Sequence, residues 1–209
     1  MAGGVVDPLA AMRDGLVVSA QAPPGSPLRD PIHMAAMARA AAAGGACGVR
    51  ADGARDIAAI RAAIHLPLIG LRKRASPDTP VVITPSLDDA REAAAAGADM
   101  IAVDATQRPR AAGGGAGELI GQLGREVGLP VLADVDCYAA GIAALEATAA
   151  ALPCPVLAEG RYAAAADVRR AFDAGAHAVV IGTAITDPVA LTRRFAAATP
   201  RSKGQRAPA

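Results

Sequence analysis

The sequence predicts an α/β fold, a TIM (β/α)8-type barrel that is incomplete if the chain has only seven βα units. Seven short apolar runs recur along the chain, and six of them end in a polar or charged residue ahead of a segment expected to be helical. Strands buried on both faces read as continuous apolar runs, and such a barrel collects polar groups at the carboxyl ends of its strands. The runs span residues 15–21, 46–50, 67–73, 99–104, 130–134, 155–159 and 176–182.

Polar strand ends have a simpler explanation, because any strand that meets water can end in a charge. For one strand alone we would favour that explanation. Six ends carrying Gln, Arg, Lys, Asp, Asp and Glu instead favour an assembled polar site.

Glycine and proline mark the boundaries between the predicted elements. Glycine stands where helices should end, within residues 44–46, 96–98 and 174–176. Proline opens three other strands, at Pro67, Pro130 and Pro155. Capping residues predict helix starts at Asp30-Pro31, at Ser86 with Asp89, and at Asp187-Pro188. We expect a first helix near residues 7–14 to close the bottom of the barrel.

An eighth apolar run, Val81–Thr84, does not add a unit. No helix fits into residues 74–80 before it, so we interpret it as an extension of the third unit. Helix-separated units then number seven, one fewer than closure of this barrel normally uses. The interval from Pro130 to Pro155 holds only one strand and one helix, which makes it the place where a unit would be missing.

Composition favours one small-molecule-binding domain. The 209 residues suit a single barrel-type domain over residues 1–200, with a disordered polar tail over 201–209. A net charge of +1 and 2% aromatic residues argue against nucleic acid and anionic membranes as partners. We expect no secretory signal or membrane span, and Cys47, Cys137 and Cys154 lack zinc-ligand spacing, so the expected location is the cytoplasm.

The strand ends, taken together, carry a family resemblance. In order they read Val-Ser-Ala-Gln21, Gly-Val-Arg50-Ala-Asp-Gly, Ile-Gly-Leu-Arg-Lys73-Arg, Ile-Thr-Pro-Ser86, Val-Asp104-Ala-Thr-Gln-Arg-Pro, Ala-Asp134 and Ala-Glu159-Gly-Arg. Their order and spacing over residues 12–198 resemble the N-acetylmannosamine-6-phosphate 2-epimerase family. The resemblance implies a TIM barrel that converts N-acetylmannosamine 6-phosphate to N-acetylglucosamine 6-phosphate in sialic acid breakdown. It also implies a reaction without metal or organic cofactor, and a homodimer.

By this resemblance, Lys73 and Glu159 are the catalytic pair. Inverting C2 of an open-chain amino sugar requires groups on both faces that remove and return a proton alpha to the carbonyl. The alternative for this pair is a mutual salt bridge.

The remaining candidates are assigned to substrate binding. Arg50 and Gln21 are candidate donors to the enolate oxygen, and Asp134 would orient Lys73 or hold a sugar hydroxyl. Asp104 is equally suited to substrate binding and to capping its loop. The phosphate is expected at the backbone after the last two strands, where a glycine can alternatively serve a tight turn. The residues expected there are Gly160, Arg161, Gly182 and Thr183.

Two departures from the family pattern bear on activity. The family has a further strand, ending in Gly-Thr-Thr-Leu-Ser-Gly-Tyr-Thr, between the strands that end here in Asp134 and Glu159, and roughly thirty residues are absent from this chain. In addition, Asp187 stands where the family's Ile-Thr-Arg-Pro motif has arginine, although an acidic residue before Pro188 makes a good N-cap.

Other functions remain compatible with the same residues. One is a degenerate barrel that binds a sugar phosphate or a protein partner without turnover. Another is a lyase that uses Lys73 as a Schiff-base amine.

Overall fold

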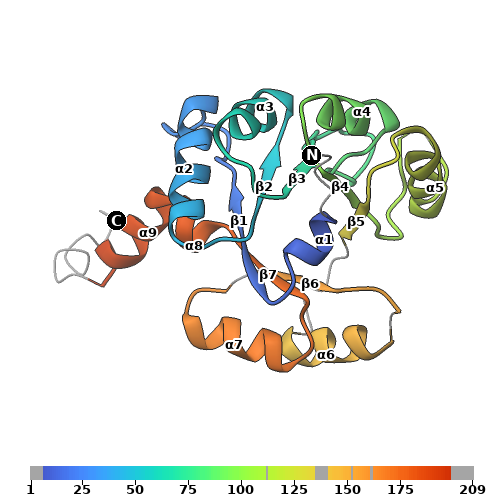
Figure 1. Ribbon diagram of the computed structural model, residues 1–209. Coiled ribbons are helices and arrows are strands. Elements are labelled where there is room, and N and C mark those ends of the chain that lie inside the picture. Colours follow the sequence, from blue (N-terminus) through green and yellow to red (C-terminus); the bar gives the residue numbers. More distant parts are fainter. Residues whose placement is uncertain (1–6, 112, 135–140, 152, 161, 199–209) are drawn as a thin grey trace, which may run out of the picture.

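The computed structural model describes residues 7–111, 113–134, 141–151, 153–160 and 162–198, and these form an α/β structure (Figure 1). Its strands are β1 (Gly15–Ala20), β2 (Gly48–Asp52), β3 (Leu68–Leu71), β4 (Met100–Asp104), β5 (Val131–Asp134), β6 (Leu157–Glu159) and β7 (Ala178–Ile181). Its helices are α1 (Pro8–Ala11), α2 (Pro31–Ala43), α3 (Ala54–Ala63), α4 (Leu87–Ala95), α5 (Ala116–Glu126), α6 (Gly141–Ala151), α7 (Ala165–Asp173), α8 (Thr183–Thr186) and α9 (Pro188–Ala196).

The described strands form one parallel, curled sheet in the order β5-β4-β3-β2-β1-β7-β6. Every adjacent pair is hydrogen-bonded, and no pairing within the described residues joins β5 to β6. The prediction of a barrel-type fold with seven βα units is therefore confirmed. The sheet is an incomplete TIM barrel whose two edges are β5 and β6.

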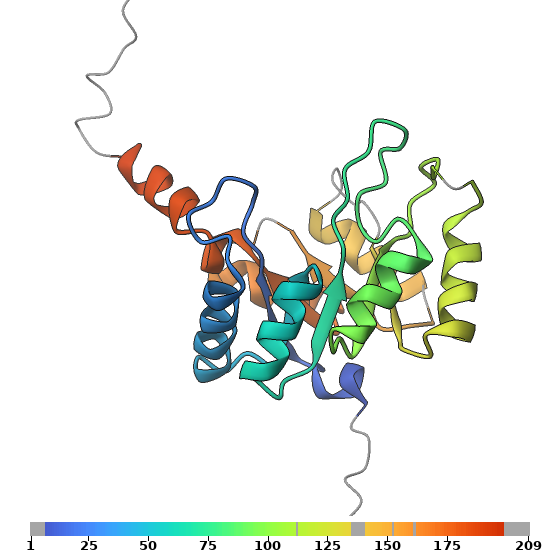
Figure 2. The ribbon, with the colours of Figure 1, turned by 90° about the horizontal axis from the view of Figure 1, so that it is seen from above.

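Helices surround the curled sheet. Figure 1 looks along the strands, with α2 to α5 around one side, α6 and α7 on the other, and α1 near the centre. Figure 2 shows α1 at one end of the strands and the loops that follow β1 and β3 at the opposite end. α9 extends away from the body of the molecule in the same view.

The inside of the curl is filled by alternate residues of the strands. Because side chains alternate between the faces of a strand, inward positions recur every second residue. Met12, just after α1, is fully buried against this interior layer, which confirms that the first helix closes the bottom. Gly48 makes room for it, since a Cβ there would lie 2.8 Å from the Met12 sulfur. The layer also includes Val17, Ile69, Leu71, Met100, Ala102, Ala178 and Val180.

A second apolar layer lies between the outer face of the sheet and the helices. Ile57 and Ile60 of α3 and Leu123 of α5 are fully buried there against residues of β2 to β4. Burying side chains of this size stabilises the fold by roughly 1.5–3 kcal/mol each. This layer holds the strand ends, and hence the polar groups beyond them, in fixed relative positions.

The predicted helix boundaries are confirmed by their caps. The side chains of Asp30, Ser86 and Asp187 accept hydrogen bonds from backbone N–H groups in the first turns of α2, α4 and α9. Gly45 and Gly97 follow helices with φ angles of 92° and 103°, a region that favours glycine.

The segment Val81–Thr84 extends the third unit, as the sequence predicts. Ile83 forms an isolated antiparallel bridge with Lys73, and its carbonyl accepts a hydrogen bond from the Asp104 N–H. The Thr84 hydroxyl is fully buried, donates to the Ala102 carbonyl at 2.6 Å and accepts from the Arg72 N–H. The chain between β3 and α4 thus folds back over the end of β3.

Two further expectations concern the C-terminal tail and membrane-spanning helices. The tail 201–209 lies outside the described residues. Among the described helices, none has the length and apolar character needed to cross a membrane.

Candidate active site

Side chains alternate between the two faces of each strand, so the inward-facing apolar residues are followed, two positions later, by inward-facing polar residues. Two residues beyond the inward-facing Leu71, Leu132 and Leu157 stand Lys73, Asp134 and Glu159. The same spacing puts Arg50 two residues beyond Gly48. Because the strands are parallel, all of these groups gather at one end of the curl.

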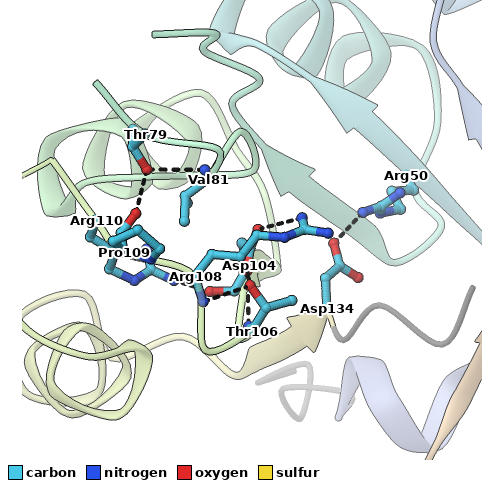
Figure 3. A network of polar contacts seen from close by, with 9 residues as sticks. All are labelled: Arg50, Thr79, Val81, Asp104, Thr106, Arg108, Pro109, Arg110 and Asp134. Carbon is cyan, nitrogen blue, oxygen red and sulfur yellow. Dashed lines mark hydrogen bonds and ion pairs between the residues drawn. The ribbon is translucent and has the colours of Figure 1, made fainter. Parts of the chain in front are cut away.

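Arg50 is the centre of this polar layer. Its side chain is almost fully buried, and its two terminal nitrogens contact carboxylates on different strands. One donates to Glu159 Oε1 at 2.6 Å and the other to Asp134 Oδ2 at 2.5 Å. Figure 3 shows the Asp134 carboxylate directed at Arg50. Asp134 is therefore paired with Arg50. Its two predicted roles, orienting Lys73 or holding a sugar hydroxyl, stay predictions.

Lys73 does not form the salt bridge that the sequence left open for it. Glu159 pairs with Arg50, and none of the described carboxylates lies within 4 Å of the Lys73 ammonium. The Lys73 side chain is accessible to solvent, while its backbone N–H donates to Asp52 Oδ1 at 2.8 Å. The ammonium thus stands in the charged cluster without a close anionic partner among the described residues.

The surroundings shift the pKa values of the two candidate catalytic groups in opposite directions. Desolvation lowers the pKa of Lys73 from its ordinary 10.5, and the charge of Arg50 lowers it further against the opposing carboxylates. Desolvation raises the pKa of Glu159 from its ordinary 4.5, with Arg50 opposing and Asp134 reinforcing the rise. The amine is thus easier to deprotonate, and the carboxyl easier to protonate, near neutral pH.

Asp134 shares the environment of Glu159. Desolvation raises the pKa of Asp134 as well, and the pairing with Arg50 opposes that rise. The neighbouring charge of Asp104 raises it further, while Lys73 lowers it. Two carboxylates and one guanidinium are therefore electrostatically coupled at this end of the sheet.

Asp104 caps the loop that follows β4. Its Oδ1 accepts hydrogen bonds from the Thr106 N–H at 2.9 Å and from the Thr106 hydroxyl at 2.6 Å (Figure 3). Its Oδ2 lies 3.7 Å from an Arg108 nitrogen, and its backbone carbonyl accepts from Arg110. Of the two roles that suited Asp104, the structure shows the cap.

The other predicted binding residues lie around the same end of the sheet. Gln21 donates from its Nε2 to the Ser19 hydroxyl at 2.9 Å, and its buried Oε1 has no partner within the described part of the chain. Gly182 approaches Ser19, with Thr183 next to it at the start of α8. Gly160 follows Glu159 with a φ of 125°. The last of these predicted residues, Arg161, lies outside the described residues.

Sequence reasoning gave no role to Asp52. Asp52 stands at the end of β2, two residues beyond Arg50, and therefore on the same face of the strand. It holds the Lys73 backbone and raises the pKa of the Lys73 ammonium. The period-two spacing from Arg50 was the signal that could have identified it.

Two surface cavities lie away from this charged cluster. One, of about 390 Å³, is lined at the amino end of the sheet by residues that include Arg13, Cys154 and His177. The other, of about 430 Å³, lies beside α4 and α5 and includes Ser86 and Arg91. Charge and strand position, rather than cavity size, therefore define the candidate site. Within the described ranges, no three His, Cys, Asp or Glu side chains are grouped to hold a metal ion.

Comparison with known proteins identifies the family. A family model described as "Putative N-acetylmannosamine-6-phosphate epimerase" matches residues 34–152 and 143–201. A relative of the same name, a 2-epimerase from Cutibacterium acnes, is 41% identical, with 90% of this chain and 94% of the relative covered. The chain belongs to the N-acetylmannosamine-6-phosphate epimerase family. A second such relative, from Synechococcus elongatus, is 41% identical over 85% of this chain and 90% of its own.

A solved structure of the epimerase family has the same fold. The N-acetylmannosamine-6-phosphate 2-epimerase from Clostridium perfringens superposes with a TM-score of 0.84 at 31% identity, covering 91% of this chain and 96% of that one. The curled sheet is thus the family barrel, as the resemblance implied.

The comparisons also locate the missing unit. The alignment with the Cutibacterium acnes epimerase runs over 218 residues, yet 90% of this 209-residue chain is about 188, so about 30 positions have no counterpart here. The two segments that match the family model, 34–152 and 143–201, overlap at residues 143–152, between β5 and β6. These are the two strands that remain unpaired with one another in the sheet.

Proposed function

We propose that this chain interconverts N-acetylmannosamine 6-phosphate and N-acetylglucosamine 6-phosphate by removing and returning the proton on C2. The observation that carries the proposal is the pair of Lys73 and Glu159. Both follow inward-facing leucines at the carboxyl end of the sheet, and their pKa values are shifted toward neutrality from opposite sides. Family membership supplies the substrate.

The proposed chemistry requires one group on each face of C2. In one direction the neutral Lys73 amine removes the C2 proton of the open-chain sugar, and the electron pair moves into an enolate whose charge rests on the carbonyl oxygen. Protonated Glu159 then returns a proton to the opposite face of C2, and the carbonyl re-forms. The reverse direction exchanges the two roles.

The developing enolate charge needs hydrogen-bond donors. Arg50 uses one N–H of each terminal nitrogen for the two carboxylates and keeps further N–H groups, which we assign to the enolate oxygen together with Gln21. We place the phosphate against the backbone after β6 and β7, at Gly160-Arg161 and Gly182-Thr183. We assign Asp134, whose carboxylate Arg50 holds, to accept from a sugar hydroxyl.

Exchange with solvent deuterium tests the reaction. Incubated with N-acetylmannosamine 6-phosphate in deuterium oxide, the protein should incorporate deuterium at C2 of substrate and product, as read by proton NMR. Lys73→Ala should abolish the exchange. Arg74→Gln is the matched control, because Arg74 is the adjacent cation but pairs with Asp89 on α4, and it should exchange normally. Binding of the sugar phosphate without exchange by the wild type would refute the proposal.

One observation favours a second candidate, a Schiff-base lyase. An amine with a lowered pKa is also what covalent addition to a carbonyl needs. Borohydride reduction in the presence of substrate separates the two reactions, since proton transfer leaves no adduct on Lys73. A stable secondary-amine adduct on that residue, with the mass of the substrate less water plus two hydrogens, would favour the lyase.

All described strands belong to one sheet with β5 and β6 at its edges, which supports a single domain over residues 1–200. The two edge strands, each with an unpaired side in the described structure, support association into a homodimer.

A further inference from the structure

We propose that Arg50, besides donating to the enolate oxygen, ties the two edges of the open sheet together and so positions Glu159 where the reaction needs it. For its catalytic part this inference rests on the proposed function. In the described part of this barrel, no strand pairs with both β5 and β6. Arg50 would then do with its side chain part of what an intervening strand does with its backbone.

The geometry places Arg50 at the only point in the described residues from which both edges are reached. It stands on β2 near the middle of the sheet, in register with Ser19 of β1 and Ile69 of β3. From there its side chain crosses the inside of the curl to the last residue of each edge strand, Asp134 of β5 and Glu159 of β6. Among the described residues, Arg50 alone forms ion pairs with both edge strands.

The edge strands need such a tie. Within the described residues, the four-residue β5 pairs only with β4, and the three-residue β6 pairs only with β7. A strand inside a closed barrel has a neighbour on each side, so each edge lacks one set of backbone hydrogen bonds. Charge-assisted bonds to a rigid guanidinium are stronger than neutral ones and hold the two carboxylates at a fixed spacing.

The charges around Glu159 also favour this role for Arg50. The charged groups that act on Glu159 are Arg50 on β2, Asp134 on β5 and Lys73 after β3. Asp52 acts in turn on Lys73, and Asp104 acts on Asp134. Asp134 and Glu159 repel one another, and Arg50 is the cation in direct contact with both. Without Arg50, repulsion between the carboxylates would drive the two edges apart.

The first test needs no substrate. Urea unfolding of Arg50→Gln, Glu159→Gln and the double variant forms a cycle, and a second cycle uses Asp134→Asn. We expect both pairs to couple by at least about fivefold in the unfolding equilibrium constant. Arg61→Gln is the control, since Arg61 pairs with Asp99 at the other end of the strands, and its effect should be additive with Glu159→Gln. Additive behaviour in either Arg50 cycle would overturn the proposal.

The second test uses the pH dependence of kcat. Arg50 lowers the pKa of both Glu159 and Lys73, so removing it should move both limbs of the profile to higher pH. Arg50→Gln should lower kcat at least tenfold with KM changed less than threefold. Arg50→Lys should recover only part of kcat, because one ammonium cannot hold two carboxylates with a fixed fork.

These outcomes separate the two proposals. A raised KM in Arg50→Gln, with both limbs of the pH profile unmoved, would mean that Arg50 acts on the substrate alone and does not position Glu159. If the wild-type protein exchanges no deuterium, the epimerase proposal fails while the unfolding cycles still decide whether Arg50 joins the edges. Arg61→Gln should leave both limbs in place.

Discussion

Lys73 and Glu159 are brought toward the same pH range by one shared environment. Burial disfavours the charged form of each, which lowers the pKa of the amine and raises the pKa of the carboxyl. A rate that needs both groups in their active protonation states should be bell-shaped, with its limbs inside the interval from 4.5 to 10.5 set by the ordinary values.

Asp52 gives a residue-scale test of this environment. Its negative charge raises the pKa of Lys73, so Asp52→Asn should lower that pKa and shift the alkaline limb of kcat to lower pH. The amide oxygen of asparagine can still accept from the Lys73 N–H, which preserves the backbone contact. The measurement is a pH–rate profile. An alkaline limb that stays in place, or moves upward, would contradict the assignment of that limb to Lys73.

Residue positions were more predictable than residue partners. Gln21, Arg50, Lys73, Asp134 and Glu159 were found because strand periodicity and polar strand ends are local features. Arg50 pairs with residues 84 and 109 positions away, and those contacts depend on how the sheet curls. Asp104 could not be assigned because a loop cap and a ligand-binding carboxylate have the same sequence pattern, and only the Thr106 contacts distinguish them.

At the scale of elements, Asp99 joins the starts of β3 and β4. Its Oδ2 accepts from the Leu68 N–H at 2.8 Å and from an Arg61 nitrogen at 2.9 Å, and Arg61 also donates to the Leu66 and Gly97 carbonyls. One carboxylate thus connects α3 and both strands at the amino end of the sheet. The acidic residue immediately before an apolar run was visible in the sequence, but its partners were not.

We expect Asp99→Ala to destabilise the protein by about 1–3 kcal/mol, because the Leu68 N–H would lose its acceptor in a buried position. Asp88→Ala is the control, since Asp88 forms an exposed pair with Arg91 and should cost less than about 1 kcal/mol. Urea unfolding measures both. Equal losses in the free energy of unfolding for the two substitutions would contradict a specific contribution from the contact between Asp99 and the Leu68 N–H.

The whole molecule is a barrel with one unit missing. The sequence alone predicted seven strands and the site of the gap, because each βα unit carries its own glycine, proline and capping signals. It did not predict whether the sheet closes, since closure depends on tilt and stagger summed over all strands. The strand order puts β2 at the centre, joined to β1 and β3, and the gap between β5 and β6 at the edges.

Hydrogen exchange should show this arrangement as a gradient of protection. Amides of β1 and β2, each between two neighbours, should exchange slowest, and those of β5 and β6 should exchange faster. Native-state exchange followed by mass spectrometry at peptide resolution measures the difference. Protection of β5 and β6 equal to that of β1 would mean that the edges are covered, for instance by a second copy of the chain.

The bridge between Lys73 and Ile83 lies outside the regular parallel sheet, so the backbone of Lys73 is held apart from that sheet. Its backbone is held by a returning stretch of chain that packs through Thr84, while the parallel ladder of β3 already ends at Leu71. Substitutions or length changes in residues 75–80 could therefore reposition the amine without disturbing the packed interior. Sequence changes in this connecting segment can therefore alter what the site accepts while the packed interior, and with it the stability of the fold, stays the same.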